Sequence, residues 1–104
     1  MASFSVAALV KETPDVVERF VSYYRRLGAE RIYVFHDGAL ADSGLTEAAL
    51  GDQDVTLTGC DAAFWAREAD VPPTHVQERL RAVGVIAHRW NRSDWLLLVD
   101  ADEF

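Results

Sequence analysis

In the first 35 residues, two segments with the pattern of a buried strand flank one with the pattern of an amphipathic helix, and few folds are compatible with this order. Ser3 to Val10 is mostly apolar on both faces, which is typical of a central strand in a parallel sheet covered by helices. Thr13 and Pro14 suit the N-cap and first position of a helix, whose apolar residues recur at helical spacing as far as Gly28. Arg31 to Phe35 is rich in β-branched and aromatic residues. The segment therefore predicts a βαβ unit.

The rest of the chain continues the same alternation. Leu45 to Leu50 predicts a short helix, and Val55 to Thr58 predicts a short strand. Gly59 to Pro73 is less regular and predicts a loop with one helical turn. Thr74 opens a second long helix, and Asp94 to Asp100 predicts a fourth strand, a continuous buried run that ends in carboxylates. We expect one three-layer, Rossmann-like α/β domain with a mostly parallel sheet, which binds ligands at the carboxyl ends of its strands.

Composition narrows the classes of function. The net charge of -7 argues against a protein that follows a nucleic-acid backbone, because that work needs clustered Lys and Arg. The longest apolar runs, Trp95 to Val99 among them, are too short to cross a bilayer, so we expect no transmembrane segment. Cys60 is the only cysteine, which excludes an internal disulfide and fits a reducing compartment. We expect a cytoplasmic protein.

Two carboxylates follow the fourth predicted strand with one residue between them. In an extended chain alternate residues point to the same side, so Asp100 and Asp102 can converge on one point. Mg²⁺ or Mn²⁺ is typically held by one or two carboxylates, with phosphate oxygens and water completing its shell. Acidic pairs at strand ends are also commonly only solvated. The spacing therefore indicates a candidate metal site without establishing one.

Three segments carry a resemblance to a known family. Ser93 to Phe104 combines a Trp, an apolar run and the motif Asp-Ala-Asp-Glu-Phe. Ala8 to Glu12 reads Ala-Leu-Val-Lys-Glu, and Arg26 to Phe35 contains Leu-Gly followed by Ile-Tyr-Val. These segments resemble the family 2-like glycosyltransferases, in particular a bacterial branch with Val-Lys-Asn-Glu and Asp-x-Asp-Glu-Phe motifs. The resemblance implies a glycosyltransferase A-type fold, of which residues 1–104 would be the N-terminal, nucleotide-sugar-binding part, ending at the Asp-x-Asp motif.

The resemblance also implies roles for matching residues. Asp100 would meet the ribose or the metal of a nucleotide-sugar, Asp102 would be the principal metal ligand, and Asp37 would lie near the base or ribose. Lys11 would lie beside the nucleotide, and Glu12, in the same donor-binding turn, stands where the family usually has Asn. The implied activity is Mn²⁺- or Mg²⁺-assisted transfer of a sugar to a saccharide, lipid or protein acceptor. We expect residues 1–104 alone to bind metal and nucleotide weakly and to transfer nothing.

Other functions remain open at this point. One is a non-catalytic α/β binding or interaction module whose acidic edge is merely solvated. Another is a phospho-accepting, receiver-like domain, although Lys11-Glu12 supplies only one of the two carboxylates that it needs after the first strand. His36 lies at the end of a predicted strand, where a nucleotide could reach it. Four arginines are expected to form a solvated basic side of the second long helix, and one of them could neutralise a diphosphate: Arg79, Arg81, Arg89 and Arg92.

Overall fold

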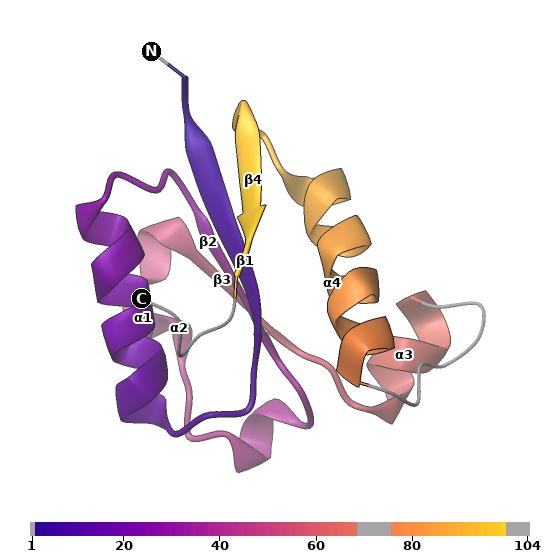
Figure 1. The fold of residues 1–104 in the computed structure, drawn as a ribbon. Helices are drawn as coiled ribbons and strands as arrows, with labels where there is room; N and C mark the ends of the chain where they lie inside the picture. Colours follow the sequence, from indigo (N-terminus) through magenta and orange to yellow (C-terminus); the bar gives the residue numbers. More distant parts are fainter. Residues whose placement is uncertain (1, 69–75, 100–104) are drawn as a thin grey trace.

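The computed structural model describes residues 2–68 and 76–99, which form one parallel sheet with helices on both sides (Figure 1). The strands are β1 (Phe4–Val10), β2 (Ile32–His36), β3 (Val55–Gly59) and β4 (Trp95–Leu98). The α-helices are α1 (Pro14–Arg26), α2 (Glu47–Leu50), α3 (Ala62–Glu68) and α4 (Val76–Trp90), with 3-10 turns η1 (Leu40–Asp42) and η2 (Asp52–Asp54). The expected α/β class and parallel sheet are confirmed.

The four strands lie in the order β3-β2-β1-β4, and every neighbouring pair is parallel. Val10 of β1 pairs with His36 of β2, and His36 pairs with Gly59 of β3. These three strands therefore end level with one another. We call these strand ends and the residues that follow them the carboxyl edge.

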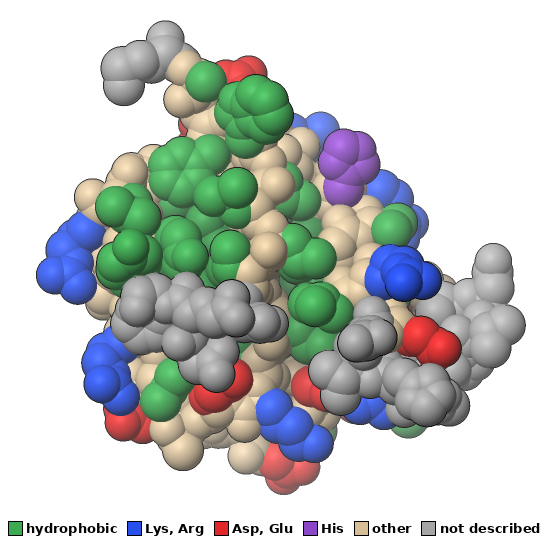
Figure 2. Space-filling view, viewed as in Figure 1, with side chains coloured by type: hydrophobic (Ala, Val, Ile, Leu, Met, Phe, Trp, Pro, Cys, Tyr) green, Lys and Arg blue, Asp and Glu red, His purple; other side chains and the backbone are tan. Residues whose placement is uncertain are grey.

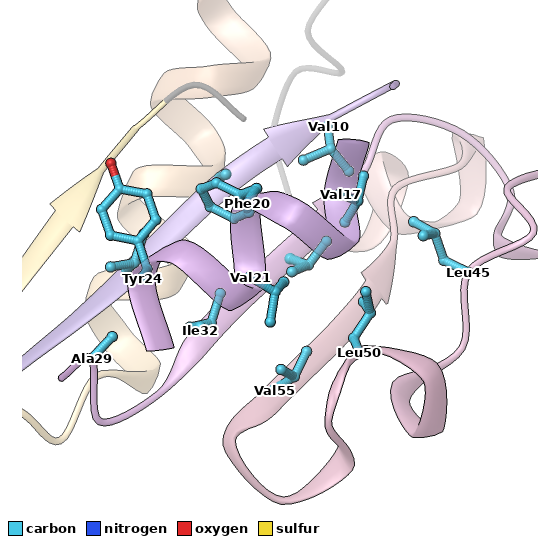
Figure 3. Close-up of a cluster of buried hydrophobic side chains, with 13 residues drawn as sticks. Val10, Val17, Phe20, Val21, Tyr24, Ala29, Ile32, Leu45, Leu50 and Val55 are labelled. Atoms are coloured by element: carbon cyan, nitrogen blue, oxygen red, sulfur yellow. The ribbon is translucent and has the colours of Figure 1, made fainter. Parts of the chain in front are cut away.

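The first face of the sheet packs against α1 and α2 (Figure 3). Alternate residues of β1, beginning with Val6, point to this face, as expected for a strand whose side chains alternate. Phe20 of α1 is fully buried here and makes an edge-to-face contact with Tyr24, with ring centroids 5.2 Å apart. The following buried side chains make up the hydrophobic cluster on this face of the sheet: Val6, Ala8, Val10, Val17, Phe20, Val21, Tyr24, Ala29, Ile32, Val34, Leu45, Leu50 and Val55.

The opposite face packs against α3 and α4, which completes three layers (Figure 1). Phe35 of β2 is fully buried here, and its ring stacks on that of Trp90 with centroids 5.5 Å apart. Tyr33 donates its hydroxyl hydrogen to the Trp90 carbonyl, 3.1 Å away. The buried members of this cluster come from three strands or their ends and from both helices: Ala7, Tyr33, Phe35, Cys60, Phe64, Trp65, Val83, Ile86 and Ala87.

The ends of the first helix are where the sequence places them, but α3 is longer than expected. Pro14 is the first residue of α1, and Gly28 follows its last turn with φ +98°. In contrast, the prediction of a single helical turn between Gly59 and Pro73 is wrong, because α3 spans seven residues. The side chain of Asp61 accepts a hydrogen bond from the Phe64 N–H at 2.9 Å and so caps this helix.

The fourth strand is not the buried run that the sequence predicts. Trp95 is 65% exposed and Leu97 is 44% exposed, while Leu96 packs partly against the α4 side. The reason is position, because β4 is the last strand of the order and pairs only with β1 among the described residues. Figure 2 shows the resulting apolar area over β4 and the strand beside it. An apolar run alone does not distinguish a central strand from an edge strand.

One ion pair ties the end of α1 to the turn before β3. The Arg25 guanidinium donates from Nε and Nη2 to both carboxylate oxygens of Asp54, at 2.6 and 2.7 Å, and also to the Leu50 carbonyl. These hydrogen bonds hold the pKa of Asp54 below its ordinary value of 3.8. Because the pair is partly exposed, it stabilises the fold only modestly.

Replacing Asp54 by Asn is expected to lower the free energy of unfolding by about 1 kcal/mol at pH 7. A carboxyl with a lowered folded pKa stabilises above its unfolded pKa, and that contribution is lost as the pH falls through the folded pKa. The difference between wild type and variant should therefore shrink below about pH 4. Urea unfolding at several pH values measures it, with Glu18→Gln on the exposed side of α1 as the control. A difference that stays constant down to pH 2 would contradict the assignment.

Candidate ligand-binding site at the carboxyl edge

Two adjoining cavities open at the carboxyl edge. The first has a volume of about 550 Å³ and lies between the β1–α1 turn and the segment after β2. The second, of about 520 Å³, extends toward α3 and α4. Lys11, Asp37 and Gly38 line both, so the two cavities adjoin at these residues, and we call them together the hollow. The other walls are Glu12, Thr13, Pro14, His36, Ala39, Asp42 and Ser43 in the first cavity, and Cys60, Asp61, Ala62, Trp65 and Arg79 in the second.

The turn after β1 places one cation and one carboxylate beside this hollow. Lys11 is exposed and is the only lysine of the chain. The carboxylate of Glu12 turns back and accepts a hydrogen bond from the Lys11 backbone N–H at 2.8 Å. Thr13 and Pro14 begin α1 in the same wall, so the positive end of the helix dipole also faces the first cavity. The turn thus places one positive side chain and the N-terminal end of α1 beside the hollow, together with the Glu12 carboxylate.

Asp37, which follows β2, is paired with an arginine from α4. Nη1 of Arg79 donates to both Asp37 carboxylate oxygens, at 3.1 and 3.3 Å, and the Asp37 side chain is only 12% exposed. The Asp37 backbone N–H donates to the Val10 carbonyl at 2.8 Å, which anchors the residue between β1 and β2. The expectation that Arg79 belongs to a solvated helix side is therefore wrong. It neutralises a carboxylate at the centre of the hollow.

The pairing of Arg79 with Asp37 was not predicted, because the direction of the helix decides where Arg79 lies. The helix that connects two parallel strands runs back across the sheet, so its first turns begin at the carboxyl edge. Arg79 is the fourth residue of α4 and lies at this edge, whereas Arg81, Arg89 and Arg92 are exposed. The signal available in the sequence was the place of the arginine in the helix.

The thiol of Cys60 lies in the wall of the second cavity but has no nucleophilic character. Burial, together with the nearby carboxylates of Asp37 and Asp61, raises its pKa to about 12. A thiol with so high a pKa stays protonated at neutral pH.

The two expected metal ligands, Asp100 and Asp102, lie outside the described residues. Within residues 2–68 and 76–99, no three His, Cys, Asp or Glu side chains come close enough to hold a metal ion. Of the carboxylates in the hollow, Asp37 is already paired with Arg79 and Glu12 bonds the Lys11 backbone. The described carboxylates alone therefore do not make a cation site.

The strand order shows which part of the carboxyl edge is most suited to a ligand. From β1 the chain proceeds to β2 and β3 on one side, and it then returns to place β4 on the other side of β1. In open α/β sheets ligands bind outside the carboxyl ends of the strands, at the point where the order reverses. Here that point lies between β1 and β4, next to Lys11. The order 3-2-1-4 also differs from the 2-1-3 arrangement of receiver-like sheets, so that alternative is not supported.

Comparisons with known proteins add no further constraint. Set against family models, curated proteins and solved structures, the chain has no significant match in any of the three. No helix in the described ranges is long and apolar enough to span a bilayer. The functional interpretation therefore rests on the residues and the geometry of this chain.

Proposed function

We propose that the carboxyl edge binds the nucleoside diphosphate of a nucleotide-sugar, and that the chain forms the donor-binding part of a glycosyltransferase. The observation that carries this proposal is the pair of adjoining cavities at the carboxyl edge, which share Lys11, the residue that follows β1 next to the point where the strand order reverses. Its combined size suits a nucleotide rather than a single ion or small acid. The motifs at the two ends of the chain support the same interpretation.

The charges of the hollow suit an extended ligand with one anionic end. Lys11 and Arg79 both line the second cavity, where they balance the carboxylates of Asp37 and Asp61 and can donate to phosphate oxygens. The first cavity adds hydroxyl and carboxylate groups, Ser43 and Asp42 among them, which suit the hydroxyls of a sugar. Such a division orients a nucleotide with its diphosphate toward α4.

A divalent cation is part of the proposal on the evidence of the sequence alone. Asp100 and Asp102, which follow β4 in the chain, would hold Mn²⁺ or Mg²⁺. Bound there, the ion would neutralise charge on the departing diphosphate. The acceptor would be a saccharide, a lipid or a protein, and the acceptor site has no candidate among the described residues.

Replacing Lys11 by Met is expected to weaken the binding of uridine diphosphate about five- to tenfold, because a charge-assisted contact to phosphate is lost. Calorimetry on residues 1–104 in the presence of Mg²⁺ measures the effect. We expect wild-type binding to be weak, with a dissociation constant of about 1 mM. The binding of uridine diphosphate should also weaken as salt is added, since an exposed lysine is screened.

The matched control is Arg26→Met, which changes the net charge by the same amount. Arg26 lies in the last turn of α1, away from the carboxyl edge where α1 begins, and it lines a separate hollow with Arg19, Ser22 and Arg25. If the arginine substitution weakens nucleotide binding as much as the lysine substitution does, general electrostatic attraction explains the binding. The proposal would then fail.

A second candidate function is a non-catalytic binding module with the same hollow. The Arg79–Asp37 ion pair favours it, because it neutralises a carboxylate that a sugar donor would otherwise meet. Such a module would bind anionic ligands equally well with Mg²⁺ and with a chelator. Binding that depends on the cation instead favours the glycosyltransferase.

A further inference from the structure

The ring of His36 lies in the wall of the first cavity, and none of the described residues is hydrogen-bonded to its Nδ1. The side chain is 8% exposed, and its Nδ1 is out of reach of solvent with no partner in the described part of the chain. A buried polar atom without a partner costs free energy, because its hydrogen bonds to water are not replaced. At the end of a central strand, an apolar ring would avoid this cost. Packing alone therefore does not explain an imidazole here, and its other nitrogen, Nε2, is the atom left to bond a ligand in the cavity.

The two ring nitrogens lie in different surroundings. A β-carbon added to Gly38 would stand 3.5 Å from Nε2, so the Nε2 edge of the ring lies beside this glycine. Gly38 lines both cavities and has φ +131°, a conformation that favours glycine. An unsatisfied buried acceptor is tolerated better than an unsatisfied buried N–H. A hydrogen on Nε2 rather than on the buried Nδ1 is therefore the arrangement that these surroundings favour, and Gly38 beside Nε2 lines both cavities.

The charges around His36 indicate which part of a ligand it meets. In the first cavity Lys11 is opposed by the carboxylates of Glu12 and Asp42, while Asp37 is paired with Arg79. A phosphate beside these groups would be repelled, whereas an uncharged oxygen would not. In the second cavity Lys11 and Arg79 balance the carboxylates of Asp37 and Asp61, so a phosphate meets no excess of negative charge there.

We propose that His36 donates a hydrogen bond from Nε2 to an uncharged oxygen of the bound nucleoside, and that it contributes to the choice of nucleoside. This inference rests on the proposed function, because it takes the ligand to be a nucleoside diphosphate. It goes further by assigning the two cavities to different parts of that ligand. The nucleoside occupies the first cavity, and the diphosphate occupies the second.

The test compares uridine diphosphate with inorganic pyrophosphate, both titrated with Mg²⁺ into residues 1–104. His36→Phe should bind uridine diphosphate about five- to tenfold more weakly, since one hydrogen bond is lost, and should bind pyrophosphate as wild type does. His36→Gln, whose amide can place an N–H near the position of Nε2, should stay within about twofold of wild type. The melting temperature of His36→Phe should equal or exceed that of wild type, because the unsatisfied nitrogen is gone.

His36→Asn provides a second route if the phenylalanine variant does not fold. Its shorter amide reaches only the Nδ1 position, so it should lose affinity where His36→Gln keeps it. Unchanged uridine diphosphate binding in the Phe and Asn variants would overturn the role of His36 and leave the proposed function standing. Equal weakening of pyrophosphate would overturn the assignment of the cavities. A wild-type protein that binds neither ligand would overturn both proposals.

Discussion

Replacing Phe20 by Ala is expected to lower the free energy of unfolding by about 3–5 kcal/mol, the largest effect of any single change considered for this chain. Phe20 is fully buried between α1 and the sheet and contacts Tyr24 edge to face (Figure 3). Truncation removes the buried ring and leaves a cavity that the surrounding β-branched residues fill only in part. A domain of this size has about 5–15 kcal/mol of stability in all, so the variant should be largely destabilised.

Urea unfolding followed by circular dichroism measures this loss. Leu27→Ala is the control, because Leu27 ends the same helix but is 56% exposed, and its truncation should change stability by less than about 0.5 kcal/mol. Phe20→Leu should lie between the two. A loss below about 1.5 kcal/mol for Phe20→Ala would show that α1 is not packed on the sheet as described.

Replacing Gly51 by Ala is expected to cost about 2–3 kcal/mol, through two separate effects. Gly51 has φ +121°, a conformation that L-residues rarely adopt. In addition, an added β-carbon would overlap the Arg25 guanidinium, so the arginine would have to leave its place. That displacement breaks its hydrogen bonds to Asp54 and to the Leu50 carbonyl.

Gly28→Ala separates the two effects. Gly28 has φ +98° but nothing within 4 Å of an added β-carbon, so only backbone strain of about 1 kcal/mol is expected there. In the Asp54→Asn background, Gly51→Ala should cost less than in wild type, because the ion pair that it displaces is already weakened. Equal losses for the two glycines, or fully additive losses in the double variant, would contradict the role of Arg25.

The sequence predicts the local structure well where a residue has a local physical reason to be there. Pro14 and Gly28 delimit α1 because each has a backbone conformation suited to one end of a helix. The strands β1 and β2 follow from apolar residues on both faces. The helix α3 also has a local signal, because Asp61 precedes it in a capping position, but its adjacent Phe64 and Trp65 do not form a helical stripe.

The features that could not be predicted depend on which elements become neighbours. The exposure of Trp95 follows from the edge position of β4, and a single apolar run does not reveal its place in the strand order. The pairing of Arg79 with Asp37 joins residues 42 positions apart and requires the direction of α4. For the same reason, the sequence predicts that His36 lies at a strand end but does not predict its burial. That its Nδ1 is buried without a partner among the described residues follows only from the elements packed around it.

Nuclear magnetic resonance is the most direct test of whether a nucleotide binds at the carboxyl edge. Uridine diphosphate and Mg²⁺ are titrated into ¹⁵N-labelled protein while the backbone amides are followed. We expect the largest shifts at Lys11, Asp37 and Gly38, which line both cavities. Shifts confined to the arginine-lined hollow of α1, at Ser22 and Arg26, or no shifts at millimolar ligand, would contradict the account.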